Sequence, residues 1–260
     1  MVWLQIGPQR FGPLRAILLD KDGTLSSSEA FLMALAEARL ATALQQVPAG
    51  LRPQLTGLLQ RAYGLLADQE TPSLDPGGAT AVASAGHNLI STATCLAQVG
   101  LSWSEALAKA QVIHGQPLDD HLSRAELTPP LSGVRQLLRR AQDLGLPCGI
   151  ISGDCRQGIE DFLRHWGLLG AITVFRGSDQ LPAKPAAQAA LHLCRDLGVD
   201  PQHCLLCGDS GQDLAMARAA GVGVVVGYTG GWRNPPRLQG FDALVADWGA
   251  VTLLASTSST

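Results

Sequence analysis

The stretch Arg15-Ala-Ile-Leu-Leu-Asp20-Lys-Asp-Gly-Thr-Leu25 decides the fold, because a short apolar run leads directly into acidic residues. Two later stretches repeat this form. Residues 147–152 (Pro-Cys-Gly-Ile-Ile-Ser) lead into Gly-Asp, and residues 203–207 (His-Cys-Leu-Leu-Cys) also lead into Gly-Asp. Short apolar runs bounded by turn residues are typical of buried parallel strands. The sequence therefore predicts three strands that each end in polar side chains.

Helical patterns separate these runs from one another and from two more candidate strands, residues 172–175 and 222–226. The helical patterns cover residues 131–144, 159–166, 185–197 and 213–220. Alternating strands and helices favour a parallel sheet with helices on both faces. We expect an α/β protein with a three-layer, Rossmann-like core. In such folds, ligands bind at the carboxyl ends of the strands.

A long interval without a convincing strand interrupts this alternation between residues 26 and 128. It contains Ala- and Leu-rich helical patterns at residues 29–46, 51–66 and 104–113. We expect an inserted all-helical cap domain over residues 26–128, with residues 1–25 and 129–260 forming the core.

Composition excludes several classes of protein. The chain has 260 residues, 46% hydrophobic and 16% charged, with a net charge of −3, which is the composition of a globular protein. We expect no nucleic-acid partner, because binding a polyanion normally requires clustered Lys and Arg. No stretch has the roughly 20 mostly apolar residues of a membrane span. The N-terminal residues do not resemble a signal peptide, so we expect a cytoplasmic protein. The sequence makes no prediction about oligomeric state.

Six cysteines fit that compartment as free thiols. Cys204 and Cys207 have a CxxC spacing, and three further candidate metal ligands lie nearby: His192, Cys194 and His203. However, residues 203–207 are predicted to form a strand, and residues three apart in a strand point to opposite faces. We therefore favour a structural role for these cysteines over a metal or redox site.

The polar strand ends, taken together, resemble the haloacid dehalogenase superfamily of phosphohydrolases. The four motifs of that superfamily occur here in order: Asp20-Lys-Asp-Gly-Thr24, Ser152, Lys184 and Gly208-Asp-Ser-Gly-Gln-Asp213. The resemblance covers residues 15–25 and about 128–230, together with the position of the helical insert. It points most closely to the phosphoglycolate phosphatase-like branch, which has a helical cap in the same place.

The resemblance implies a mechanism that suits these residue types. Asp20 would attack phosphorus and form an aspartyl phosphate. Asp22 would protonate the leaving group and then deprotonate the attacking water. By the same resemblance Asp20, the backbone carbonyl of Asp22, and Asp209 would bind Mg²⁺, with Asp213 in support, since this ion prefers oxygen ligands. The phosphate-binding candidates are Gly23, Thr24, Ser152, Gly153 and Lys184. The chain has only two other lysines, Lys21 and Lys109.

The sequence departs from relatives at two places. Asp154 follows Ser152-Gly153 where relatives often have Lys or Asn, and it either weakens phosphate binding or faces away from it. Residues 26–29 (Ser-Ser-Ser-Glu) lack the Asp-Ser pair of many phosphoglycolate phosphatases, so that substrate is not assigned from the sequence.

The expected function is hydrolysis of a small phosphorylated metabolite. Asp22 argues against a dehalogenase and a phosphonatase, whose leaving groups do not need its proton. Two alternatives stay open: a phosphomutase of the β-phosphoglucomutase type and a non-catalytic binding domain that keeps the fold. Substrate choice is expected to lie in the cap. For each of its polar candidates we favour a solvated helix position over a substrate contact; these candidates are Arg39, Arg52, Arg61, His87, Asn88 and Arg124.

Overall fold

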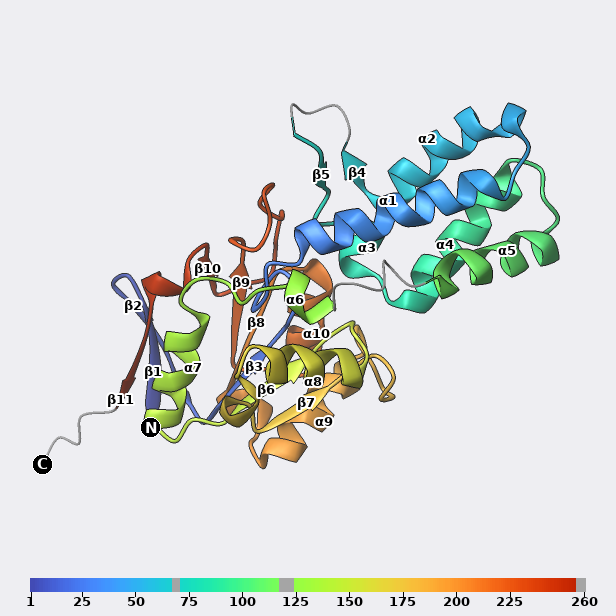
Figure 1. Cartoon of the computed structure of the whole chain (residues 1–260). Helices are drawn as coiled ribbons and strands as arrows, with labels where there is room; N and C mark the ends of the chain where they lie inside the picture. Colours follow the sequence, from blue (N-terminus) through green and yellow to red (C-terminus); the bar gives the residue numbers. More distant parts are fainter. Residues whose placement is uncertain (67–70, 117–123, 256–260) are drawn as a thin grey trace, which may run out of the picture. The chain divides into compact units, whose positions relative to one another are not determined.

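The computed structural model describes residues 1–66, 71–116 and 124–255 of the chain (Figure 1). It divides into two compact units. Met1–Ser28 and Arg124–Thr260 form the core unit, and Glu29–Ser123 forms the insert unit. The division falls a few residues inside the predicted insert at both ends. Ser26 and Ser28 hydrogen-bond to Asp22, and Arg124 forms ion pairs with core residues, so these residues belong to the core unit.

A six-stranded parallel sheet is the centre of the core unit, with the strand order β10-β9-β8-β3-β6-β7. The α/β, three-layer prediction is confirmed. Five of these strands match the predicted ones, whereas the edge strand β10 was missed. The strands are β3 (Ala16–Leu19), β6 (Cys148–Ile151), β7 (Val174–Arg176), β8 (Cys204–Gly208), β9 (Val224–Tyr228) and β10 (Ala243–Val245).

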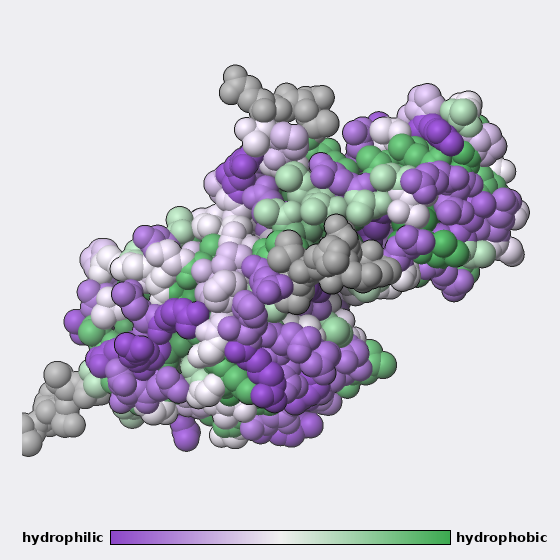
Figure 2. All heavy atoms as spheres, in the orientation of Figure 1, coloured by the Kyte–Doolittle hydropathy of each residue, from purple (hydrophilic) through white to green (hydrophobic). Residues whose placement is uncertain are grey.

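Helices cover both faces of this sheet. Successive side chains of β3 point to opposite faces and all four are buried, so both faces must be covered. Ile17 and Leu19 pack in the same cluster as α7 (Val134–Asp143) and α8 (Arg156–His165). Ala16 and Leu18 pack on the opposite side with the second pair of helices, α9 (Ala187–Leu197) and α10 (Gly211–Ala219). Figure 2 shows mostly hydrophilic side chains over the outer surface of α8, which is the expected exterior of an amphipathic helix.

A second, three-stranded antiparallel sheet was not predicted. It has the order β11-β1-β2 and consists of β1 (Val2–Ile6), β2 (Gln9–Leu14) and β11 (Val251–Ala255). Val2, Leu4 and Leu253 join it to the α7–α8 side of the core. The core unit also contains the short helix α6 (Arg124–Leu127) and three 3₁₀ turns, at Leu169–Ala171, Pro201–His203 and Trp248–Ala250.

The insert unit is mainly helical, and Leu55, Leu59 and Leu96 are fully buried in its own hydrophobic core. It is not all-helical, because β4 (Leu65–Leu66) and β5 (Ser73–Leu74) form a small antiparallel pair. Its helices are α1 (Glu29–Gln45), α2 (Arg52–Tyr63), α3 (Ala79–Val82), α4 (Ala85–Gln98) and α5 (Trp103–Gly115), with a 3₁₀ turn at Ala49–Leu51. Among the described residues, no helix is both long and apolar enough to span a membrane.

The cysteines of the CxxC spacing lie on opposite faces of the sheet. Cys207 packs on the α7–α8 side and Cys204 on the α9–α10 side, as expected for residues three apart in a strand. Cys204 instead lies beside Cys194, with the two sulfur atoms 3.7 Å apart. All six cysteines are free thiols. This arrangement does not form a metal site from Cys204 and Cys207.

Candidate active site

Three carboxylates meet at the carboxyl edge of the parallel sheet. Asp20 directly follows β3, Asp209 follows the neighbouring strand β8, and Asp213 lies in the first turn of α10. One carboxylate oxygen from each lies within 4.8 Å of the others, and all three residues are buried. A Ser210–Asp213 capping box begins α10 and fixes the position of Asp213. The topology therefore brings together three of the four acids that the sequence singled out.

Lys184 is the cation of this cluster. Its Nζ lies 2.5 Å from Oδ1 of Asp20 and 2.5 Å from Oδ1 of Asp213. Burial acts to lower the pKa of Lys184, but the charges of Asp20 and Asp213 outweigh it and hold the pKa above its usual value. Lys184 is therefore a charged ammonium. We call Asp20, Asp209, Asp213 and Lys184 the acid-rich cluster, because three carboxylates face one ammonium.

Burial, together with the charges of neighbouring carboxylates, raises the pKa values of two of these acids. Burial raises the pKa of Asp20 to about 6, and the charge of Asp213 adds to the rise while Lys184 opposes it. Burial and the charges of Asp20 and Asp213 also raise the pKa of Asp209 well above its usual value. A divalent cation would relieve this repulsion, and carboxylate oxygens are its preferred ligands. The donor set therefore fits a divalent metal ion.

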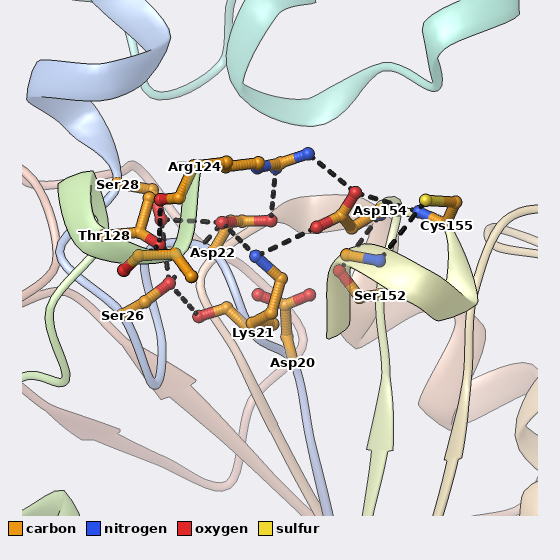
Figure 3. Close-up of polar contacts among 12 residues, drawn as sticks. Asp20, Lys21, Asp22, Ser26, Ser28, Arg124, Thr128, Ser152, Asp154 and Cys155 are labelled. Atoms are coloured by element: carbon orange, nitrogen blue, oxygen red, sulfur yellow. Dashed lines mark hydrogen bonds and ion pairs between the residues drawn. The ribbon is translucent and has the colours of Figure 1, made fainter. Parts of the chain in front are cut away.

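A second cluster, shown in Figure 3, consists of Asp22, Asp154, Lys21 and Arg124. Lys21 Nζ lies 2.6 Å from Asp22 Oδ1 and 3.2 Å from Asp154 Oδ2. The Arg124 guanidinium lies 3.2 Å from Asp22 Oδ2 and 2.6 Å from Asp154 Oδ1. Each cation therefore bridges both carboxylates. We call these four residues the balanced cluster, because two carboxylates face two cations.

Asp22 is held as an anion in this cluster. Ser28 donates a hydrogen bond of 2.6 Å to Asp22 Oδ1, and Ser26 donates a longer one of 3.4 Å. Burial acts to raise the pKa of Asp22, but the charges of Lys21 and Arg124 and the Ser28 hydrogen bond together lower it below its usual value. These contacts favour the ionised form of Asp22, which suits a base; to act as an acid, Asp22 would first take up a proton.

Asp154, which departs from relatives in the sequence, contacts cations and a backbone N–H in the structure. Its carboxylate is nearly buried and contacts Lys21, Arg124 and the backbone N–H of Cys155. The charge of Asp154 is therefore already compensated. Lys21 is 1% exposed and lies 5.5 Å from the centre of the Phe162 ring. The sequence did not indicate that Lys21 pairs with Asp154, because 132 residues lie between them and no local pattern connects them.

The phosphate-binding candidates lie on the loops around these clusters. Ser152 directly follows β6 and is buried, and its hydroxyl accepts a hydrogen bond from Asp154 N at 3.1 Å. Gly153 is exposed. Gly23 has φ +82°, and a Cβ there would collide with Asp209 and Trp232, so only glycine fits. The Thr24 hydroxyl donates to Asp209 Oδ1 at 3.0 Å.

The proposed cap candidates have separate environments. Arg124 belongs to the core unit and contacts Asp22. Asn88 is buried in the insert unit, where its Nδ2 donates to the backbone carbonyls of Ala79, Ala83 and Ser84, which indicates a structural role. Arg52, Arg61 and His87 are exposed, and Arg39 is half-buried.

Sequence reasoning missed Trp232 altogether. Its indole Nε1 donates to Asp209 Oδ2 at 2.5 Å, and Trp232 is 6% exposed. The only sequence signal is the pair of glycines immediately before it, Gly230 and Gly231, in the loop after β9. Glycine pairs are common in loops, so the pattern alone does not identify a residue of the site.

Comparison with known proteins identifies a family of hydrolases. The family description "haloacid dehalogenase-like hydrolase" matches residues 14–221, and the chain belongs to this family. A phosphoglycolate phosphatase from Chromobacterium violaceum is 37% identical over 111 residues, covering 42% of this chain and about half (49%) of the relative's length. Another from Thiobacillus denitrificans is 26% identical over 255 residues, covering 94% of this chain and 96% of the relative.

Solved structures agree on the fold. A haloacid dehalogenase-like hydrolase from Bacteroides fragilis has a TM-score of 0.60 at 19% identity, covering 91% of this chain and 98% of that one. A structure from Haemophilus somnus, described as that of a predicted phosphoglycolate phosphatase, has a TM-score of 0.58 at 19% identity, covering 90% of this chain and 95% of that one. At this identity the likeness concerns the fold alone.

Proposed function

We propose that the chain is a Mg²⁺-dependent phosphatase that hydrolyses the phosphate monoester of a small metabolite through an aspartyl phosphate on Asp20. The observation that carries the proposal is the acid-rich cluster, in which Asp20, Asp209 and Asp213 lie together at the sheet edge with one charged lysine. Membership of a hydrolase family supports hydrolysis, and the names of the relatives favour a phosphate monoester.

Asp20, Asp209 and the backbone carbonyl of Asp22 would hold Mg²⁺, with Asp213 in support. The ion would offset the negative charges of the substrate phosphate and of the carboxylates around it. Lys184 adds a positive charge beside Asp20. Together these charges keep Asp20 ionised, as a nucleophile must be, although burial alone raises its pKa.

The reaction divides into two displacements at phosphorus. In the first, an oxygen of Asp20 forms a bond to phosphorus, the bond to the substrate oxygen breaks, and that oxygen takes a proton from Asp22. In the second, a water oxygen attacks phosphorus while its proton passes to Asp22. The bond to Asp20 breaks, and inorganic phosphate leaves. Asp22 thereby regains the proton that it gave to the leaving oxygen.

The balanced cluster suits these two protonation states of Asp22. When Asp22 is ionised, Lys21 and Arg124 bind it directly. When Asp22 is protonated, the two cations still have Asp154 as a partner, so neither is left as an unpaired buried charge. We propose that Asp154 serves this purpose and does not contact phosphate.

The phosphate itself would be held by Lys184, by Ser152 and by the Gly153 amide, because hydroxyl and loop N–H groups orient phosphate without repelling it. Gly23 and Thr24, in the loop after Asp20, were the other phosphate-binding candidates. The Thr24 hydroxyl donates to Asp209 and its backbone N–H donates to the carbonyl of Lys21, so we assign these two residues to shaping the loop.

The insert unit is proposed to be the cap that selects small substrates. Phosphoglycolate is the first substrate to test because two relatives bear that name, and a sugar 6-phosphate is the second because a Pseudomonas aeruginosa relative is named N-acetylmuramic acid 6-phosphate phosphatase. We expect both to react faster than a phosphorylated protein, since a cap that closes over a substrate admits only small molecules. A clear preference for the protein would contradict the cap proposal.

The function is tested by release of inorganic phosphate from an aryl phosphate with Mg²⁺ and with a chelator. We expect activity only with the metal. The Asp20→Asn variant should lose on the order of 10⁴- to 10⁶-fold in kcat, because a neutral amide is a poor nucleophile. Asp161→Asn is the matched control, since Asp161 is an exposed aspartate on α8.

Two outcomes would contradict this mechanism. Full activity in chelator would exclude the metal, and wild-type activity of Asp20→Asn would mean that water attacks phosphorus directly. Transfer of the phosphate to a second position of a sugar phosphate, without release, would instead identify a phosphomutase. No turnover of any phosphate ester would favour a non-catalytic binding domain.

A further inference from the structure

Trp232 lies in the loop that follows β9 and directs its indole into the core unit. The side chain is 6% exposed, and its Nε1 donates to Asp209 Oδ2 at 2.5 Å. An indole N–H can only donate a hydrogen bond, and a carboxylate can only accept when ionised. The pair is therefore matched in polarity and buried on both sides.

The backbone of the loop is shaped to allow this contact. A Cβ at Gly231 would collide with the carbonyl of Gly23, and a Cβ at Gly230 would collide with the carbonyl of Ala246, just beyond β10. The loop therefore passes closely between the Asp20 loop and the end of the edge strand. A Cβ at Gly23 would collide with both Trp232 and Asp209. Three glycines thus make the space in which the indole reaches the carboxylate.

The other oxygen of Asp209 has a donor of its own. The Thr24 hydroxyl, which is fully buried, donates to Oδ1 at 3.0 Å. One neutral donor on each oxygen fixes the plane of the carboxylate without cancelling its charge. Each carboxylate oxygen can also accept a second interaction. Asp209 is therefore oriented and still able to bind a cation beside Asp20 and Asp213.

We propose that Trp232 is a positioning residue for metal binding, which acts by holding the Asp209 carboxylate in the orientation that a divalent cation requires. The inference rests on the proposed function, because it takes Asp209 as a metal ligand. Groups that hydrogen-bond to metal ligands typically contribute 10- to 100-fold to metal affinity. Trp232 does not touch phosphate or metal in this proposal and acts only through Asp209.

The test is Mn²⁺ affinity of the full-length, substrate-free chain, measured from the electron paramagnetic resonance signal of free Mn²⁺. Trp232→Phe keeps most of the ring and removes the N–H donor, so we expect Mn²⁺ binding to weaken about 10- to 100-fold. Trp166→Phe is the matched control, because the Trp166 indole donates to a backbone carbonyl, that of Ala125, at 2.8 Å. We expect the control to bind Mn²⁺ as the wild type does.

A second variant separates loss of the N–H from loss of packing, in case Trp232→Phe folds poorly. Site-specific β-(3-benzothienyl)alanine at position 232 replaces the N–H with sulfur and keeps the bicyclic shape. The same weakening in this variant, with wild-type unfolding by urea, supports a positioning role over a packing role. Unchanged Mn²⁺ binding in this variant would overturn the inference, because the N–H would then have no effect on the metal site. Tighter binding would also overturn it, because it would mean that the Trp232 N–H competes with the metal for the Asp209 carboxylate.

Asp209→Asn separates this inference from the proposed function. Mn²⁺ binding that is strong in the wild type and lost in Asp209→Asn establishes the carboxylate as a ligand, whatever Trp232 does. If Asp209→Asn binds Mn²⁺ as the wild type does, both the metal site and the inference fail.

Discussion

The two clusters at the sheet edge contain neighbouring residues of one loop but have opposite electrostatic character. Asp20 belongs to the acid-rich cluster, where burial raises its pKa to about 6. Asp22 belongs to the balanced cluster, where Lys21 and Arg124 outweigh burial and lower its pKa below the usual value. The comparison teaches that the first cluster needs a further cation, whereas the second already contains its own.

Asp22→Ala should have a large effect on activity and should separate proton transfer from metal binding. We expect kcat/KM for an alkyl phosphate to fall 10²- to 10⁴-fold, because a basic alkoxide needs the proton of a general acid. An aryl phosphate should lose less, since a phenolate leaves readily. Mn²⁺ affinity should be nearly unchanged, because the Asp22 side chain is in the balanced cluster. Equal losses for both substrates, with no phosphoenzyme build-up on rapid quenching, would refute the proton-transfer role.

Asp154→Asn breaks the balanced cluster and should destabilise the protein. The substitution leaves two cations facing Asp22 alone. Breaking a buried ion pair outright typically costs about 3–5 kcal/mol, and we expect a loss of stability up to that range because Asp22 still contacts both cations. The free energy of unfolding in urea measures this cost. Asp196→Asn is the control, since its ion pair with Arg176 is partly exposed and such pairs contribute about 0–1 kcal/mol. If the two variants lost the same stability, the buried network would have no special role.

Asp209→Asn should stabilise the metal-free protein, whereas Asp154→Asn should destabilise it. Burial and the charges of Asp20 and Asp213 raise the pKa of Asp209, so at neutral pH a neutral amide relieves repulsion. We expect the free energy of unfolding in chelator to rise relative to the wild type. A loss of stability would show that the hydrogen bonds from Thr24 and Trp232 outweigh the repulsion.

A further effect is on the pH dependence of stability without metal. The pKa of Asp20 is about 6 in the folded chain against a model-peptide value of 3.8. Folding therefore favours protonated Asp20, and this contribution is complete below about pH 3.8 and lost as the pH rises through about 6. Urea unfolding in chelator should show a smaller loss of stability between pH 4 and 7 for Asp20→Asn than for wild type. Parallel pH profiles would contradict the raised pKa.

Much of the core unit could be predicted from the sequence, because its signals are local. The run at residues 16–19 is apolar at every position, as a strand buried on both faces requires. The missed strands lack this signal. β2 contains Gly12 and Pro13, which favour a turn, and β10 has only three residues with Leu244 exposed. β1 pairs with β11 from the other end of the chain, so no local pattern reveals the pairing.

The sequence by itself placed Asp20, Ser152 and Asp209 at the ends of predicted parallel strands, and such strands bring their carboxyl ends to one edge of a sheet. Only the tertiary structure decided how the charges are shared. Asp154 pairs with Lys21 and Arg124, and Trp232 reaches Asp209 through a loop that three glycines leave open. These contacts join residues far apart in the chain, and their formation depends on side-chain distances within a packed interior, which periodicity and spacing along a sequence do not specify.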